Sequence, residues 1–215
     1  MLRSYLDVHT HHSTADSTIT AIVNKYEAFE QGPGTGYCSM GLHPWYLNDL
    51  PAQMQSLKQY SREAGVLAIG ECGLDTLCPT PPALQEQAFD EQIAWANETG
   101  KPLIIHCVRA YSKALSMLRA ATVPVIFHGF SKKLQQAREV LDQGHYLSFG
   151  AALLRERSLL PAVLAEVPAD RFFLETDTAS ASITEMYRAA ALIRKTETDM
   201  LILQLQQNFK KVFGI

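Results

Sequence analysis

Six residues that can bind a divalent cation recur at the ends of apolar segments along this 215-residue chain. They are His9, His11, Glu71, His106, His128 and Asp177. Imidazole nitrogens and carboxylate oxygens are ligands that suit Zn²⁺, Mn²⁺ and similar ions. One histidine at a strand end is more often a structural residue than a ligand, but six such positions in one chain predict a metal centre. Paired cations at such a centre can activate water for hydrolysis.

The first candidates lie in the segment Asp7-Val8-His9-Thr10-His11. Side chains alternate along a strand, so Asp7, His9 and His11 are expected to point to the same side. Two imidazoles that are two residues apart on one face can bind the same cation. This segment therefore predicts the start of the metal centre.

The remaining candidates each follow a later apolar run. Glu71 follows Val66–Ile69, and its carboxylate can bridge two cations, which a neutral imidazole cannot do. His106 and His128 each end an apolar run in the same way, and we choose Asp177 as the ligand after the last run. We expect the neighbouring Glu175 to face the boundary of the core or a nearby cation.

Short apolar runs alternate with helical patterns, which is typical of an α/β protein with a parallel sheet. The predicted strands are Tyr5–Val8, Ile19–Asn24, Tyr37–Gly41, Leu67–Gly70, Leu103–His106, Val125–His128, Tyr146–Phe149 and Phe172–Leu174. The predicted helices are Pro51–Ala64, Pro81–Thr99, Ala110–Ala121, Lys132–Asp142, Ser158–Val167, Ile183–Lys195 and Glu197–Phe213. Eight strands predict an α/β, TIM-like (β/α)8 barrel in a single domain over residues 1–215, with the active site at the C-terminal ends of the strands.

The spacing of the first three strands departs from this pattern. Only residues 11–18 and 25–36 separate them, and a parallel crossover usually needs a dozen or more residues. We therefore expect a distorted barrel, with helices missing after the first two strands. Capping signals support two later helices: Thr80 before Pro81, and Ser131 at the start of the helix near Leu134.

Composition limits the function. The net charge is −3 and the pI about 6.2, whereas a broad nucleic-acid-binding face would normally make a domain basic. A phosphate-bearing substrate must then be held by metal and a few local cations. No signal peptide or membrane-spanning run is apparent, and the four cysteines read as reduced core thiols. We expect a cytoplasmic monomer without an obligate protein partner or membrane contact.

Several motifs, in this order, match a known family. They are DVHTH (7–11), GLHP (41–44), GECGLD (70–75), LQEQAFDEQIAWA (84–96), PLIIHCVRA (102–110), FHGFS (127–131), LETD (174–177) and QQNFKKVFG (206–214). With them the chain resembles the TatD-like metal-dependent deoxyribonuclease family, within the amidohydrolase-type barrel superfamily, as a shortened member. The resemblance implies hydrolysis of phosphodiester bonds in DNA, often as an exonuclease, with two divalent ions (Zn, Mn or Mg).

The resemblance also implies a role for individual residues. His9, His11 and Asp177 would bind one metal ion, His106 and His128 the other, and Glu71 would bridge the two. Asp177 would accept the proton of the attacking water, so Asp177 and Glu71 are the implied catalytic residues. His43, Arg109 and Lys132 are the expected substrate contacts, with Lys133 beside the last, and Asp75 is expected to orient a ligand histidine. His12 and His145 match nothing and are expected at the surface.

The chain departs from the family in two places. It has less sequence between the HxH strand and GLHP, and Thr178-Ala179 replaces the usual Ser-Pro after LETD. We therefore expect DNA or a short oligonucleotide, with a small phosphoester possible, as substrate. The alternatives are a histidinol-phosphatase-like phosphoesterase, which GECGLD and LETD argue against, C–N bond hydrolysis on the same barrel, and a non-enzymatic metal-binding interaction protein. The intact ligand set argues against the last.

Overall fold

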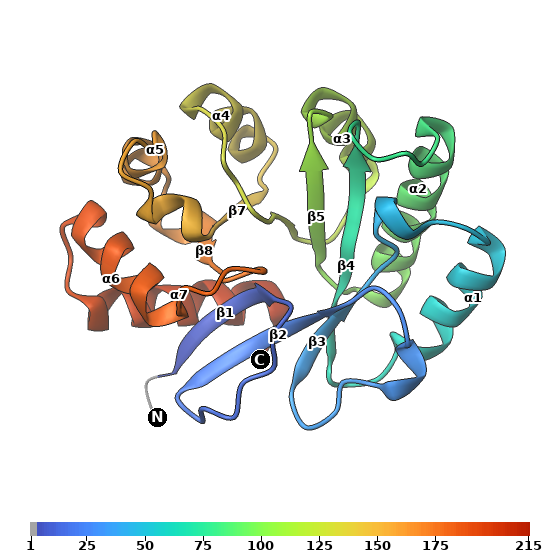
Figure 1. Ribbon diagram of the computed structural model, residues 1–215, viewed down its shortest axis with the longest axis horizontal. Helices are drawn as coiled ribbons and strands as arrows, with labels where there is room; N and C mark the ends of the chain where they lie inside the picture. The colour runs from blue at the N-terminus through green and yellow to red at the C-terminus, as the bar shows by residue number, and fades with distance from the viewer. Residues whose placement is uncertain (1–3) are drawn as a thin grey trace. The chain divides into compact units, whose positions relative to one another are not determined.

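The structure is a computed structural model that describes residues 4–215. Within them it contains eight strands, β1 to β8, and most strands are followed by a helix (Figure 1). The chain divides into two compact units: the first holds the residues up to Ile22 and from His128 onward, and the second holds Val23–Phe127. β2 (Ile19–Lys25) contains the boundary between them.

The first unit combines the two ends of the chain. Its elements are β1 (Tyr5–Thr10), α4 (Leu134–Asp142), β7 (Tyr146–Phe149), the 3-10 turn η4 (Ala151–Leu154), α5 (Leu160–Glu166), the turn η5 (Ala169–Arg171), β8 (Phe172–Leu174), α6 (Ile183–Arg194) and α7 (Thr198–Phe213). β7 and β8 pair in parallel, with Leu147 opposite Phe172. β1 contacts β8, and α6 and α7 pack against both strands (Figure 1). Their buried aromatic and aliphatic side chains form the core of this unit.

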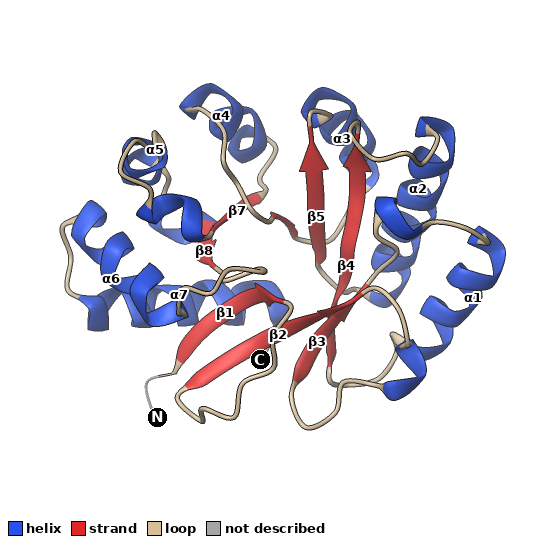
Figure 2. Cartoon of the chain, viewed as in Figure 1, coloured by secondary structure: helices blue, strands red, loops and turns tan. Residues whose placement is uncertain are grey.

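The second unit is a parallel sheet with helices packed against it. Its elements are the turn η1 (Phe29–Gln31), β3 (Tyr37–Met40), the turn η2 (Pro44–Tyr46), α1 (Leu50–Tyr60), β4 (Val66–Asp75), α2 (Pro82–Thr99), β5 (Leu103–Val108), α3 (Tyr111–Met117), the turn η3 (Leu118–Ala120) and β6 (Val125–Phe127). β3–β4, β4–β5 and β5–β6 all pair in parallel. α2 packs against β4, and α3 against β5 (Figure 2).

β4 is the longest strand and carries two glycines that let it approach β5 closely. Gly70 and Gly73 have φ angles of 146° and 138°, which side-chain-bearing residues rarely adopt. A Cβ atom on Gly70 would collide with the carbonyl oxygen of Ile104, and one on Gly73 with that of His106. The strand therefore continues through GECGLD and delivers both Glu71 and Asp75 alongside β5.

The element order and the parallel pairings are those of a TIM-like (β/α)8 barrel, so the predicted fold class is confirmed. The predicted lack of helices after the first two strands is also confirmed. In the described part of the chain, residues 11–18 contain no helix, and only the short turn η1 lies between β2 and β3. The buried, free thiols of Cys38, Cys72 and Cys107 agree with the reduced core thiols that we expected.

Four local predictions are wrong. β4 ends at Asp75 instead of Gly70. The residue before a proline avoids the helical conformation, so Pro81 is extended before Pro82 and α2 begins one residue late, with no cap from Thr80. Lys133 is extended, so α4 begins at Leu134, too far along for Ser131 to cap it. His145, expected at the surface, is buried, whereas His12 is exposed as predicted.

No helix in residues 4–215 has the length and hydropathy needed to cross a membrane.

Candidate metal centre

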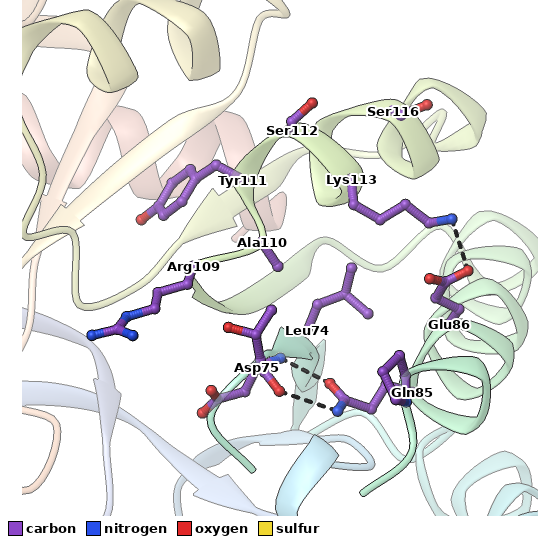
Figure 3. Close-up of a pocket in the computed structure, with 12 residues that line it drawn as sticks. Leu74, Asp75, Gln85, Glu86, Arg109, Ala110, Tyr111, Ser112, Lys113 and Ser116 are labelled. Atoms are coloured by element: carbon purple, nitrogen blue, oxygen red, sulfur yellow. Dashed lines mark hydrogen bonds and ion pairs between the residues drawn. The ribbon is translucent and has the colours of Figure 1, made fainter.

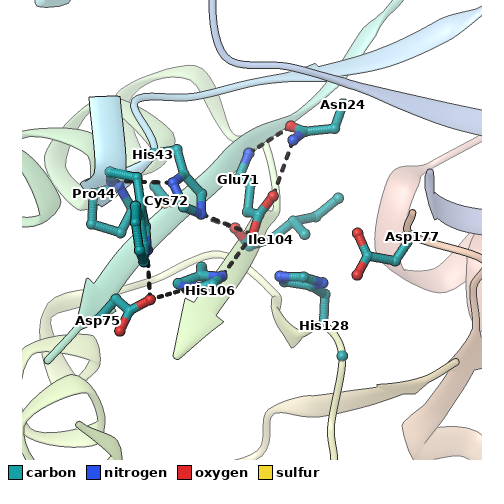
Figure 4. A network of polar contacts seen from close by, with 12 residues as sticks. Asn24, His43, Pro44, Glu71, Cys72, Asp75, Ile104, His106, His128 and Asp177 are labelled. Carbon is teal, nitrogen blue, oxygen red and sulfur yellow. Dashed lines mark hydrogen bonds and ion pairs between the residues drawn. The ribbon is translucent and has the colours of Figure 1, made fainter. Parts of the chain in front are cut away.

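Three metal-binding side chains meet in the second unit. His106 Nδ1 lies 2.8 Å from Glu71 Oε1, and His43 Nε2 lies 3.3 Å from the same oxygen (Figure 4). One ligand atom from each of the three residues lies within 4.8 Å of the others. Glu71 comes from β4, His106 from β5, and His43 from the residue that caps η2. We call these three residues the second-unit group.

A buried amide holds the carboxylate of this group. Asn24 Nδ2 donates to Glu71 Oε2 at 3.0 Å, and the Glu71 backbone N–H donates to Asn24 Oδ1 at 3.0 Å (Figure 4). Both side chains are nearly fully buried. With one oxygen bound by Asn24, Glu71 presents the other oxygen to the two imidazoles. Its orientation is therefore set before any cation arrives.

Asp75 supports His106 from the other side. Asp75 Oδ2 lies 3.1 Å from His106 Nε2 and accepts a 2.7 Å hydrogen bond from Trp45 Nε1. Burial acts to raise the pKa of Asp75, but hydrogen bonds from Trp45, His106 and the backbone N–H of Leu77 together hold it below its ordinary value. Asp75 therefore stays ionised, and its charge can orient the imidazole ring.

Four metal-binding side chains gather in the first unit. Asp177 Oδ1 lies 3.7 Å from His9 Nε2 and 3.5 Å from His11 Nε2. The rings of His9 and His128 lie 4.1 Å apart between centroids. One ligand atom each of His9, His128 and Asp177 lies within 4.8 Å of the others. We call His9, His11, His128 and Asp177 the first-unit group.

Two buried carboxylates stand behind the first-unit group. Asp7 accepts hydrogen bonds from the backbone N–H of Thr176 at 3.0 Å and from its hydroxyl at 2.6 Å, which ties β1 to the segment after β8. Burial raises the pKa of Asp7 to about 6, although the Thr176 hydrogen bonds act to lower it. Glu175 is fully buried, and its Oε1 accepts from the Gly129 N–H at 2.6 Å and lies 3.5 Å from His128 Nδ1.

The backbone is unusual at two predicted site residues. Asp177 has a φ of 52° and Arg109 a φ of 54°, the left-handed region that residues other than glycine rarely occupy. Asp177 is held there by backbone hydrogen bonds from its N–H to His9 and from His11 to its carbonyl. Such conformations cluster at functional sites, where neighbouring structure fixes them.

The expected substrate contacts lie in different surroundings. His43 is part of the second-unit group, and the exposed Arg109 lines a pocket in the same unit. Lys132 is half-buried in the loop before α4. A pocket of about 390 Å³ in the first unit is lined by Glu175, Asp177 and the exposed Arg155.

Sequence analysis missed Asn24 and Trp45 as members of the site. Asn24 lies in the predicted strand Ile19–Asn24, at its C-terminal end, where the other site residues also lie. That position was a usable signal. Trp45 follows His43-Pro44 and offered no such signal, because an indole in a loop is more often an apolar contact.

The donor chemistry of both groups fits divalent cations. Each combines imidazole nitrogen with carboxylate oxygen, the set that suits zinc and manganese, and each is held by further carboxylate or amide groups. A parallel β/α fold that presents such groups at its strand ends has the features of a metal-dependent hydrolase.

Comparison with known proteins places the chain more closely. The sequence profile of the TatD related DNase family matches residues 7–214. The "Uncharacterized metal-dependent hydrolase YcfH" of Escherichia coli K12 is 29% identical over 195 residues, covering 82% of this chain and 73% of that protein. The "3'-5' ssDNA/RNA exonuclease TatD" of Cronobacter sakazakii is 38% identical over 152 residues, covering 66% of this chain and 56% of that protein.

A solved structure supports the fold. The crystal structure of YJJV, a TatD homologue from Escherichia coli K12, superposes over 100% of both chains with a TM-score of 0.84 and 23% identity. The chain belongs to the TatD related DNase family, and it is a metal-dependent hydrolase that acts on ester bonds.

Proposed function

We propose that this protein hydrolyses phosphodiester bonds in DNA or short oligonucleotides with the help of two divalent cations. The observation that carries the proposal is the presence of two preassembled imidazole–carboxylate groups, one in each unit. In the proposal each group supplies ligands: His9, His11, His128 and Asp177 from the first unit, and Glu71 and His106, with His43 beside them, from the second. The bridging role of Glu71 stays a prediction.

The bound cations would supply positive charge that acidifies water and stabilises the leaving oxygen. Asp177 accepts the proton of the attacking water, because its side chain is 37% exposed and water can reach it. Glu71 is only 5% exposed and is fixed by Asn24, so it serves as a ligand. Asp75 and Glu175 hold His106 and His128 in their orientations.

Arg109 and Lys132 bind non-bridging phosphate oxygens in this proposal. Arg109 is exposed and has a guanidinium that can donate two parallel hydrogen bonds to a phosphate. The net charge of −3 leaves few such cations, which favours a short stretch of nucleic acid over an extended duplex. The exonuclease names of related proteins point to the same substrate class.

The test is digestion of end-labelled single-stranded DNA with added Mn²⁺ or Mg²⁺, alongside small phosphomonoesters and phosphodiesters. We expect DNA and small diesters to be cleaved, and His128→Ala to remove the activity. Cleavage of monoesters alone would favour a small-molecule phosphatase. Stoichiometric metal uptake without cleavage of any substrate would indicate a binding protein and contradict the proposal.

A further inference from the structure

The second unit contains a pocket of about 580 Å³ that the proposed chemistry does not use. It lies between the end of β4, the first turns of α2 and the segment 109–116 that includes α3 (Figure 3). Ligand pockets for small organic groups are typically of this size. The pocket is therefore large enough to hold part of a substrate.

One wall of the pocket connects directly to the second-unit group. Asp75 lines the pocket, and its Oδ2 lies 3.1 Å from His106 Nε2. Arg109, one residue after β5, lines the same pocket. A group bound there would be separated from His106 by a single side chain. The pocket is thus placed for the part of a substrate next to the reacting bond.

The charges around the pocket are almost all neutralised. Lys113 reaches across to Glu86 and forms a 2.7 Å ion pair (Figure 3). Asp75 is bound by Trp45 and His106. In the part of the chain that the structure describes, Arg109 forms no ion pair. The interior therefore suits an uncharged group, with one cation available for an adjoining phosphate.

The polar groups at the base of the pocket are occupied by the protein itself. Gln85 Oε1 accepts from the Asp75 N–H at 2.8 Å, and its Nε2 donates to the carbonyl oxygens of Asp75 and Thr80. This amide fixes the floor and leaves little hydrogen-bonding capacity for a ligand. The walls add apolar surface from Leu74 and Pro82. The lining suits a flat, mainly apolar group with polar edges.

We propose that this pocket binds the nucleobase of the nucleotide that adjoins the scissile phosphate, while Arg109 contacts that phosphate. The inference rests on the proposed function and adds a base-binding subsite to it. The base packs against Leu74 and Pro82, and the Thr76 and Ser116 hydroxyls meet its polar edge. Hydroxyl groups donate or accept as needed, so the subsite accepts all four bases with small preferences.

A pocket-filling variant tests the proposal. Ser112→Trp places an indole at the mouth of the pocket, and Arg119→Trp places the same side chain on an exposed residue that does not line it. Each is assayed with a short oligonucleotide and with methyl 4-nitrophenyl phosphate, which has no nucleobase. We expect Ser112→Trp to lower the ratio of the two kcat/KM values about 10-fold, the effect of losing an apolar contact surface. Arg119→Trp should keep the wild-type ratio, and an unchanged ratio in Ser112→Trp would overturn the proposal.

A binding measurement separates the subsite from the activity. The wild-type protein in chelator is titrated with 2'-deoxyadenosine 5'-monophosphate and with 2-deoxyribose 5-phosphate, and NMR shifts of backbone amides in residues 109–116 are followed. We expect saturable shifts with the nucleotide, much smaller shifts with the sugar phosphate, and loss of the nucleotide response in Ser112→Trp. If no substrate is hydrolysed but these shifts occur, the proposed function fails and the subsite stands. Absence of nucleotide shifts in the wild-type protein contradicts the subsite whatever the activity.

Discussion

The two groups of metal-binding residues differ in how firmly the protein holds them. In the second-unit group, Glu71 is buried, lies 2.8 Å from His106 Nδ1 and is bound by Asn24. In the first-unit group, the corresponding carboxylate of Asp177 is 37% exposed and lies 3.5 to 3.7 Å from its histidines. The first contains a preformed hydrogen-bonded network, whereas the second has room between its donors.

This difference suggests a division of labour. A rigid, buried carboxylate can hold a cation but is poorly placed to exchange protons with water. An exposed carboxylate at a strained backbone position can take a proton from water and release it to solvent. We therefore infer that the second-unit group is chiefly a ligand set, and that the first-unit group both binds metal and moves the proton.

The largest effect is expected from Asp177→Asn. The amide keeps the size of the side chain but cannot accept a proton, so hydrolysis should fall on the order of 10³-fold. Circular dichroism and the melting temperature should stay close to those of the wild-type protein. Retention of most of the activity would remove Asp177 as the proton acceptor.

A change at Asn24 tests the rigidity of the second-unit group. Asn24→Ala removes both hydrogen bonds that orient Glu71, so metal affinity should fall about 10- to 100-fold. The matched control is Asn48→Ala, on an exposed residue away from the group. Isothermal titration with Mn²⁺ measures the affinity. Equal affinities in the two variants would show that Asn24 does not organise the group.

The corresponding test for the first unit is Glu175→Gln. The substitution removes the negative charge beside His128 Nδ1 but keeps an oxygen for the Gly129 N–H. We expect metal affinity to fall about 10-fold, less than in Asn24→Ala, because this group is less tightly preformed. A loss larger than that of Asn24→Ala would reverse the comparison between the two units.

The smallest effect concerns stability, at a residue outside both groups. Burial lowers the pKa of His145 to about 4, below its ordinary value of 6.5. The unfolded chain then binds a proton between pH 6.5 and pH 4 that the folded protein does not, so stability falls as the pH falls through this range. His145→Gln should weaken this dependence by about 1 to 3 kcal/mol. Urea unfolding of both proteins at pH 7 and pH 4.5 measures it, and parallel curves would contradict the assignment.

Comparing the variant with the wild-type protein isolates His145 from Asp7. Asp7 has a raised pKa of about 6, so the folded protein binds a proton in the range where the unfolded chain does not. Its contribution therefore opposes that of His145, increasing stability as the pH falls. Both proteins contain Asp7, and the difference between them removes it.

The sequence was sufficient for the order of the strands and helices, because apolar runs and turn residues mark most of them. It misled at β4, where Gly70 and Gly73 read as the end of a strand. Their actual role is close contact with β5, which depends on a neighbour that lies far along the chain. Helix starts at Thr80 and Ser131 failed because the extended backbone of Pro81 and Lys133 decides them.

The candidate ligands could be predicted because histidines and carboxylates at strand ends are visible in sequence. Their supporting residues could not, since the need for Asn24 arises only from the second oxygen of Glu71. Trp45 likewise matters through one indole N–H that meets Asp75. The burial of His145 depends on which elements cover it, which its own segment does not reveal.

The most direct test of the account counts the metal ions on the chelated protein and follows hydrolysis as they are returned. The wild-type protein should take up about two Mn²⁺ or Zn²⁺ ions per chain and gain hydrolysis as it does so. Asp177→Asn and His106→Ala should each take up fewer ions and remain inactive. Hydrolysis by the metal-free protein, or full uptake by both variants, would contradict the claim that these two groups bind the catalytic cations.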